Sequence, residues 1–130
     1  MKILKTTDRV TIKHNDLEVV FSPLSYGQSL ELASMEGIEA GETVVNVAKR
    51  TALLIKYSVK EIRGLTDFHG EPIVIKAEKE LSEEDLSDAI TALSRSPVIG
   101  PISYISTSCD LKPLDGIEFL VNGKAVEIKK

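Results

Sequence analysis

The longest sustained helical pattern in the chain is Glu42–Tyr57, with the sequence ETVVNVAKRTALLIKY. Four of its apolar residues recur at spacings of four, four and three, as on one face of an α-helix, and three more widen that face beyond a narrow stripe. In that order they are Val44, Ala48, Ala52, Ile55, Val45, Val47 and Leu54. We therefore predict a long helix buried on most of its circumference, with Ala52 and Ile55 almost fully buried, around which the chain packs.

Composition is typical of a small globular protein. The 130 residues are 42% hydrophobic, which suits one domain spanning residues 1–130. The net charge of −4 argues against a nucleic-acid-binding protein, which usually carries a basic excess. No apolar run reaches the roughly 18 residues of a membrane span, and the start MKILKTTDR is too weakly apolar for a signal peptide. Cys109 is the only cysteine, so a reducing, cytoplasmic setting is the default expectation.

Two β-hairpins are predicted, one near each end of the chain. Arg9–Ser22 turns at Asn15-Asp16, and Ile117–Ile128 turns at Asn122-Gly123, a dipeptide that strongly favours a two-residue turn. In each hairpin one register gathers the apolar side chains on a single face. The predicted pairs are Val10 with Phe21, Ile12 with Val19, Lys13 with Glu18, Phe119 with Val126, and Ile117 with Ile128.

The helix predicted over Ser25–Met35 begins with a capping box, in which Ser25 and Gln28 satisfy each other's backbone N–H groups. Its weak apolar side consists of Leu30, Ala33 and Met35. After the central helix, the sequence favours an extended segment, a loop at Thr66–Glu71 and a strand at Ile73–Ile75.

A further helix starts at Ser82, an N-cap followed by three acidic residues that suit the positive end of the helix dipole. Leu81 and Leu86 occupy the positions of a hydrophobic staple. The apolar face of this helix is Leu86, Ala89, Ile90 and Leu93.

Val98–Ser108 is ambiguous. Ile99, Ile102 and Ile105 lie three apart, and Pro101 suits the first position of a short helix but not the interior of one that begins at Ser96. The predicted fold is thus α+β, with an N-terminal β-hairpin, a four-helix middle containing a long buried central helix, and a C-terminal β-hairpin. Each hairpin needs a sheet partner, a helix or another chain, because it is too small to be stable alone.

The polar residues suggest no catalytic, cofactor or metal site. His14 and His69 lack the further ligands that a metal site needs, and Cys109 lacks a neighbouring base, so we expect a half-buried structural thiol. The six acidic residues between Glu78 and Asp88 are best explained as a solvated loop and helix start. A basic stripe of Lys49, Lys56, Lys60 and Arg63 would form only if the central helix continued to Arg63, and we expect that helix to end earlier. An enzyme is not expected.

Phe68 is an aromatic residue within the polar loop Thr66–Glu71. Its side chain is either an anchor for a partner or folds back on the core. The second alternative is favoured, because large apolar side chains in loops are usually covered.

Three stretches together resemble a tail assembly chaperone of the long, non-contractile-tailed (lambda-like) bacteriophages. They are VTIKHNDLEVVFSPLSYGQSLEL (10–32), LLIKYSVKEIRGLTDFHGEPI (53–73), and LSEEDLSDAI (81–90) with the apolar stretch Ile99–Ile105. The resemblance implies a small, non-enzymatic protein of the host cytoplasm, often oligomeric, that is absent from the finished virion. Such proteins bind the long, apolar, helical tape measure protein, keep it soluble, and help to recruit tail tube subunits.

A chaperone of an amphipathic helix needs apolar surface beyond its own core. We expect that surface on Phe68 and on the two later helices, at Leu86, Ile90, Ile99 and Ile102. No nucleic acid, membrane or cofactor is implied. The alternative is a virion structural protein, a head–tail connector or tail completion protein, whose terminal hairpins pair across subunits into a ring. A third hypothesis, a small enzyme or regulator, would be favoured by a pocket with converging polar groups.

Overall fold

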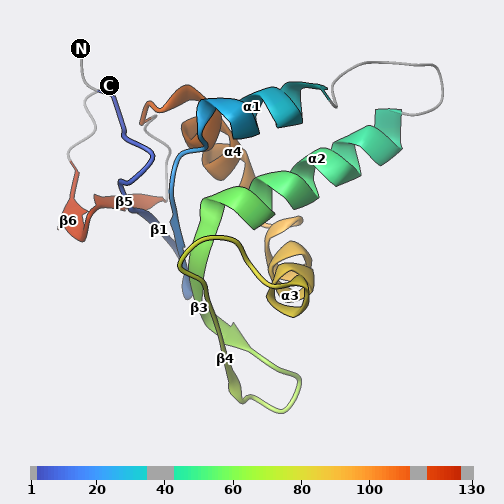
Figure 1. Ribbon diagram of the computed structural model, residues 1–130. Coiled ribbons are helices and arrows are strands. Elements are labelled where there is room, and N and C mark those ends of the chain that lie inside the picture. Colours follow the sequence, from blue (N-terminus) through green and yellow to red (C-terminus); the bar gives the residue numbers. More distant parts are fainter. Residues whose placement is uncertain (1–2, 35–42, 112–116, 127–130) are drawn as a thin grey trace.

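The computed structural model describes residues 3–34, 43–111 and 117–126. In these ranges, helices gather on one face of an antiparallel sheet (Figure 1). The elements are β1 (Val10–His14), β2 (Leu17–Phe21), α1 (Tyr26–Ala33), α2 (Thr43–Ser58), β3 (Val59–Thr66), β4 (Pro72–Lys76), α3 (Glu83–Leu93), α4 (Ile99–Ser108), β5 (Glu118–Val121) and β6 (Lys124–Ala125). The α+β class predicted from the sequence is confirmed, with the β3–β4 hairpin inserted between the second and third helices.

The strands form one sheet in the order β4-β3-β2-β1-β5-β6, and all the neighbours are antiparallel. β1 lies between β2 and β5, so the hairpins from the two ends of the chain join along β1. The two terminal hairpins therefore stabilise each other, because each is the sheet partner that the other needs.

Both predicted hairpin registers are confirmed where the structure describes them. In the first, Val10 pairs with Phe21 and the central pairs follow in step through to the turn. In the second, the N–H of Val126 donates to the carbonyl of Phe119 at 3.3 Å. Both Asn122 and Gly123 have positive φ, 51° and 80°, as a type I′ turn requires. The predicted pair of Ile117 with Ile128 lies partly outside the described residues.

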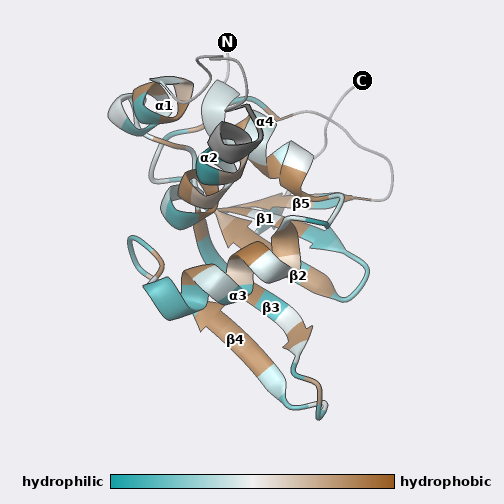
Figure 2. Ribbon diagram, turned by 90° about the vertical axis from the view of Figure 1, so that its right-hand side faces the viewer, coloured by the Kyte–Doolittle hydropathy of each residue, from teal (hydrophilic) through white to brown (hydrophobic). Residues whose placement is uncertain are grey.

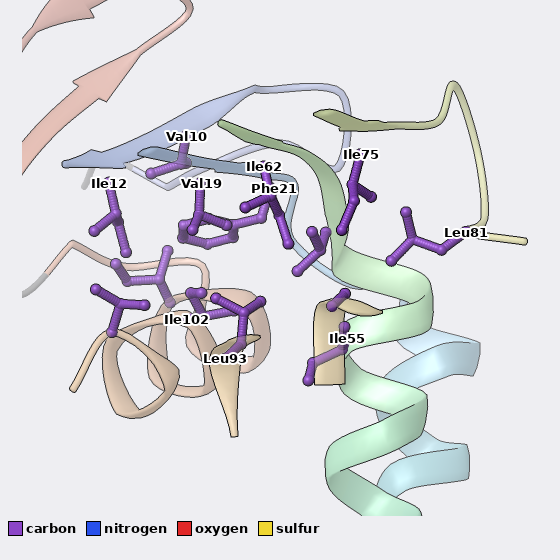
Figure 3. Packing of buried hydrophobic residues seen from close by; sticks show 14 of the residues in the cluster. Val10, Ile12, Val19, Phe21, Ile55, Ile62, Ile75, Leu81, Leu93 and Ile102 are labelled. Atoms are coloured by element: carbon purple, nitrogen blue, oxygen red, sulfur yellow. The ribbon is translucent and has the colours of Figure 1, made fainter. Parts of the chain in front are cut away.

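The core forms where the apolar face of the sheet meets the helices. Figure 3 shows side chains of β1, β2, β3 and β4 directed toward Leu93 of α3, Ile102 of α4 and Ile55 of α2. The members of this cluster with no or almost no exposed surface include Val10, Ile12, Val19, Phe21, Ile55, Ile62, Ile75, Leu93, Ile102 and Ile105. Covering each such side chain contributes about 1.5–3 kcal/mol, so this interface accounts for much of the stability.

The opposite face of the sheet carries a row of charges across four strands. Glu118, Lys13, Glu18 and Arg63 lie next to one another in the strand pairing, with alternating sign. Arg63 Nη1 donates to Glu18 Oε1 at 3.0 Å. Such cross-strand pairs favour the observed register by about 0.2–1 kcal/mol each.

The central helix is less buried than the sequence suggested. Its observed bounds differ from the predicted ones by one residue at each end, and Ile55 is fully buried as predicted. Ala52, however, is only half-buried, and Ala48 is exposed. The physical reason is visible in Figure 1, where α2 runs away from the sheet after its junction with β3. Only the end of α2 next to β3 packs against the sheet.

The ambiguous segment is a helix, α4, with Val98 as its N-cap residue. Pro101 is its third residue rather than its first, so the predicted position was wrong. Proline is tolerated there because the N–H groups of the first helical turn have no acceptor within the helix. The first intrahelical bond comes one residue later, from the N–H of Ile102 to the carbonyl of Val98 at 3.0 Å.

Gly64 of β3 lies against the backbone of the β1–β2 turn, where there is no room for a side chain. Its φ is +90°, and an added Cβ would lie 1.8 Å from the carbonyl oxygen of Asp16. Gly64→Ala should therefore lower the free energy of unfolding by at least about 2 kcal/mol, through backbone strain and overpacking. Urea denaturation at unchanged m-value measures this loss.

Gly70→Ala is the matched control, because Gly70 has φ +80° but nothing within 4 Å of an added Cβ. It should lose only the conformational term, about 1 kcal/mol. Equal losses in the two variants would contradict the assigned contact between Gly64 and the turn.

Candidate partner-binding surface

The loop between β3 and β4 is closed by the side chain of Asp67. Its Oδ1 accepts hydrogen bonds from the N–H groups of His69, at 2.8 Å, and Glu71, at 2.9 Å. The backbone closes the same loop, because the N–H of Asp67 donates to the carbonyl of Glu71 at 2.8 Å. An aspartate that bonds the backbone after it is a recognised way to fix a turn. The tip therefore has a defined shape.

Phe68 sits on this tip with 100% of its surface exposed. The favoured expectation that its ring folds back on the core is wrong. Figure 2 shows why, since the β3–β4 hairpin projects beyond the helices and carries the loop away from them. The ring lies edge to face with its neighbour His69, with 6.1 Å between the ring centroids. The other alternative, an anchor for a partner, fits this geometry.

β4 adds a second exposed apolar side chain and a free strand edge. Val74 is 64% exposed, because it points to the face of the sheet opposite the core. β4 pairs with β3 on one side and with no described strand on the other. An unpaired edge of this kind offers backbone hydrogen bonds to another extended segment.

Helix α1 presents an apolar stripe to solvent. Tyr26 is 81% exposed and Leu30 is 53% exposed, and Ala33 follows on the same face. Leu30 and Ala33 belong to the weak apolar side predicted from the sequence, and Met35, its third predicted member, lies outside the described residues. The buried residue is Leu32, which forms a small cluster with Leu24 and with Leu54 of α2. An eight-residue helix with leucines on both sides does not reveal by periodicity which side is covered.

The two later helices do not provide the surface expected of them. Ile102 is fully buried against the sheet, so a partner cannot contact it in the folded domain. Leu86, Ile90 and Ile99 are half-buried and pack against the core. Because part of each side chain is still exposed, their role in partner binding stays a prediction. The reason is topological, since α3 and α4 supply the layer that covers the sheet.

The other polar candidates lie apart from one another. His14 ends β1, His69 lies at the hairpin tip, and Cys109 is half-buried at the end of α4, as expected. Because α2 ends at Ser58, Lys60 and Arg63 belong to β3, and the basic stripe does not form on one helix, as predicted. Within residues 3–34, 43–111 and 117–126, no three His, Cys, Asp or Glu side chains are grouped so as to hold a metal ion. In the same ranges no helix has the length and apolarity to span a membrane.

Comparison with known protein families, curated proteins and solved structures finds no match to this chain. The surface described above is therefore interpreted from its own geometry. Of the exposed apolar residues, only Phe68 was singled out by the sequence as a partner contact. Val74 could have been found from strand alternation, because it lies between Ile73 and Ile75 of the core face. Tyr26 carried no such signal.

At the hairpin tip, Asp67 and Phe68 should differ in what they contribute to the free energy of unfolding. Asp67→Ala should cost about 1 kcal/mol, because two backbone N–H groups lose their acceptor. Hydrogen exchange at the amides of His69 and Glu71 should accelerate. Phe68→Ala should stay within about 0.5 kcal/mol of the parent, because an exposed ring makes little contact. A clear loss of stability in Phe68→Ala, measured by urea denaturation, would show that the ring supports the fold.

Proposed function

We propose that this chain is a non-enzymatic tail assembly chaperone of a long-tailed, non-contractile bacteriophage. In this proposal it binds the tape measure protein, keeps it soluble in the host cytoplasm, and helps to recruit tail tube subunits. The observation that carries the proposal is Phe68, a wholly exposed aromatic ring on a loop fixed by Asp67. This ring lies within one of the three stretches that resemble the chaperone family.

An exposed aromatic on a fixed loop is suited to binding an apolar client. Burying such a ring against a partner contributes about 1.5–3 kcal/mol. Because Asp67 already holds the loop, less conformational entropy is lost on binding than with a mobile loop. Aromatic residues of this kind commonly dominate the binding energy of an interface. The tip thus supports recognition of apolar side chains on a client.

The stripe on α1 supports the same proposal from a second element. Tyr26 and Leu30 are four residues apart and lie on one helix face, where they can pack against an apolar helix of a client. A long helical client repeats its apolar face many times along its length. It could therefore be held at two separate places on one chaperone, or by several copies.

One observation favours the alternative, a virion structural protein such as a connector or tail completion protein. The free edge of β4 could pair with another subunit in a ring. The terminal hairpins lend less support than the sequence suggested, because β1 and β5 pair within the chain. The chaperone therefore remains the first proposal.

Co-expression with the tape measure protein of the same phage tests the proposal. The client should become soluble and co-purify with the parent chain. Phe68→Ser should reduce the recovered client severalfold, and the triple variant with Tyr26→Ser and Leu30→Ser should abolish recovery. Ile3→Ser is the matched control, because Ile3 is also an exposed apolar residue but lies outside both surfaces. Each variant should keep the parent's melting temperature.

Two results would contradict the proposal. One is a client that stays insoluble with the parent chain, and the other is full recovery with the triple variant. Mass spectrometry of purified particles separates the alternative, since a chaperone is absent from them and a connector is present.

A further inference from the structure

A cleft of about 440 Å³ lies at one end of the sheet, separate from the hairpin tip. Its walls come from the segment before β1, the stretch that leads from β2 into α1, the junction of α2 with β3, and the segment after β4. These four stretches are distant from one another in sequence and meet because the strands align. A volume of this size is typical of sites for small molecules.

Two half-buried cationic residues, Arg9 and Lys60, line the cleft, together with the exposed Lys79. Lys60 is half-buried, and its Nζ donates to the carbonyl of Tyr57 at 2.8 Å and to the carbonyl of Lys79. Burial, together with the neighbouring charge of Arg9, lowers the pKa of Lys60, whereas Glu80 acts in the opposite direction. Arg9 Nη2 makes one long bond, 3.4 Å, to the carbonyl of Glu78. Among the described residues, neither Arg9 nor Lys60 forms an ion pair with a carboxylate.

Two donors in this wall are buried without a partner in the described part of the chain. One is Nη1 of Arg9, and the other is the Oγ of Ser22. Ser22 is only 4% exposed, and its backbone N–H is used by the carbonyl of Ser58 at 2.9 Å. A buried donor without an acceptor normally destabilises a fold. A group with acceptor atoms that binds against this wall would remove that cost.

The start of α1 adds a further positive contribution. Ser25, its N-cap residue, lines the cleft, so the positive end of the helix dipole lies there. Its side chain is already used by the capping box with Gln28. The helix thus contributes its field, while Arg9, Lys60 and Ser22 contribute the hydrogen-bond donors.

We propose that this cleft binds a small oxyanion, a phosphate or carboxylate group, held by Arg9, Lys60 and Ser22. An oxyanion presents several acceptor lone pairs to donors that lie around it. It would pair the two cations and satisfy both of the unpartnered donors. Glu78 and Glu80 on the same walls oppose further negative charge, which favours a ligand with a single anionic group. This binding is independent of client recognition at Phe68.

Nuclear magnetic resonance titration of the full chain tests the inference. Sodium phosphate and sodium acetate are each added against sodium chloride at equal ionic strength. Saturable shifts are expected at the amides of Arg9, Ser22 and Lys60 with at least one of the two oxyanions and not with chloride. The oxyanion that binds more tightly identifies the class of ligand. No saturable response beyond that of chloride would overturn the proposal.

Ser22→Ala separates a ligand site from a structural role. Because the hydroxyl has no partner among the described residues, its removal should leave the melting temperature unchanged or raise it. The Kd for the bound oxyanion should rise at least about tenfold, as for loss of a hydrogen bond to a charged group. Arg9→Gln should weaken binding at least as much, and Arg95→Gln, an exposed cation on another part of the surface, should not.

An unchanged Kd in Ser22→Ala would overturn the proposal, whether or not the melting temperature of the variant falls. Ser22→Ala decides the question alone if Arg9→Gln does not fold.

Discussion

The pairing of β1 with β5 is the contact on which the rest of the structure depends. It joins segments 113 positions apart at Arg9 and Asn122, where the backbone N–H of Arg9 donates to Asn122 Oδ1 at 2.9 Å. The N–H of Asn122 returns a bond to the carbonyl of Arg9 at 2.7 Å. Closing so long a loop costs entropy, which local hairpin contacts cannot offset alone. Once the loop is closed, β5 lies beside β1, and Phe119 of β5 joins the core that the helices cover.

That covering layer decides where apolar surface is left for a partner. The apolar faces of α3 and α4 mostly cover the sheet, although Tyr104 of α4 is 42% exposed, so the most exposed apolar side chains of the helices and strands lie on elements that extend past it. These are the β3–β4 hairpin, with Phe68 and Val74, and the outer side of α1, with Tyr26 and Leu30. A binding surface on projecting elements can change without disturbing the core. This arrangement suits a protein whose proposed work is to hold an apolar client.

The cleft at the strand ends differs from these apolar surfaces because polar and cationic side chains line it. Its donors are buried or charged, and Nη1 of Arg9 and the Oγ of Ser22 have no partner among the described residues. Polar groups in such positions usually have a role beyond stability, because a fold built only for stability would replace them with apolar side chains. The chain therefore has two proposed recognition surfaces, one apolar and projecting, the other cationic and recessed.

The sequence by itself determined the elements whose signals are local. Hairpin registers at Val10–Phe21, the capping box at Ser25, the N-cap at Ser82 and the bounds of α2 all rest on side chains within a few positions of one another. Only the tertiary structure decided which faces are covered. Periodicity places Leu30 and Leu32 on opposite sides of α1, and Ala52 and Ile55 on the apolar side of α2, but cover comes from segments far along the chain. The meeting of Arg9, Ser22 and Lys60 depends in the same way on strand alignment, which no local pattern encodes.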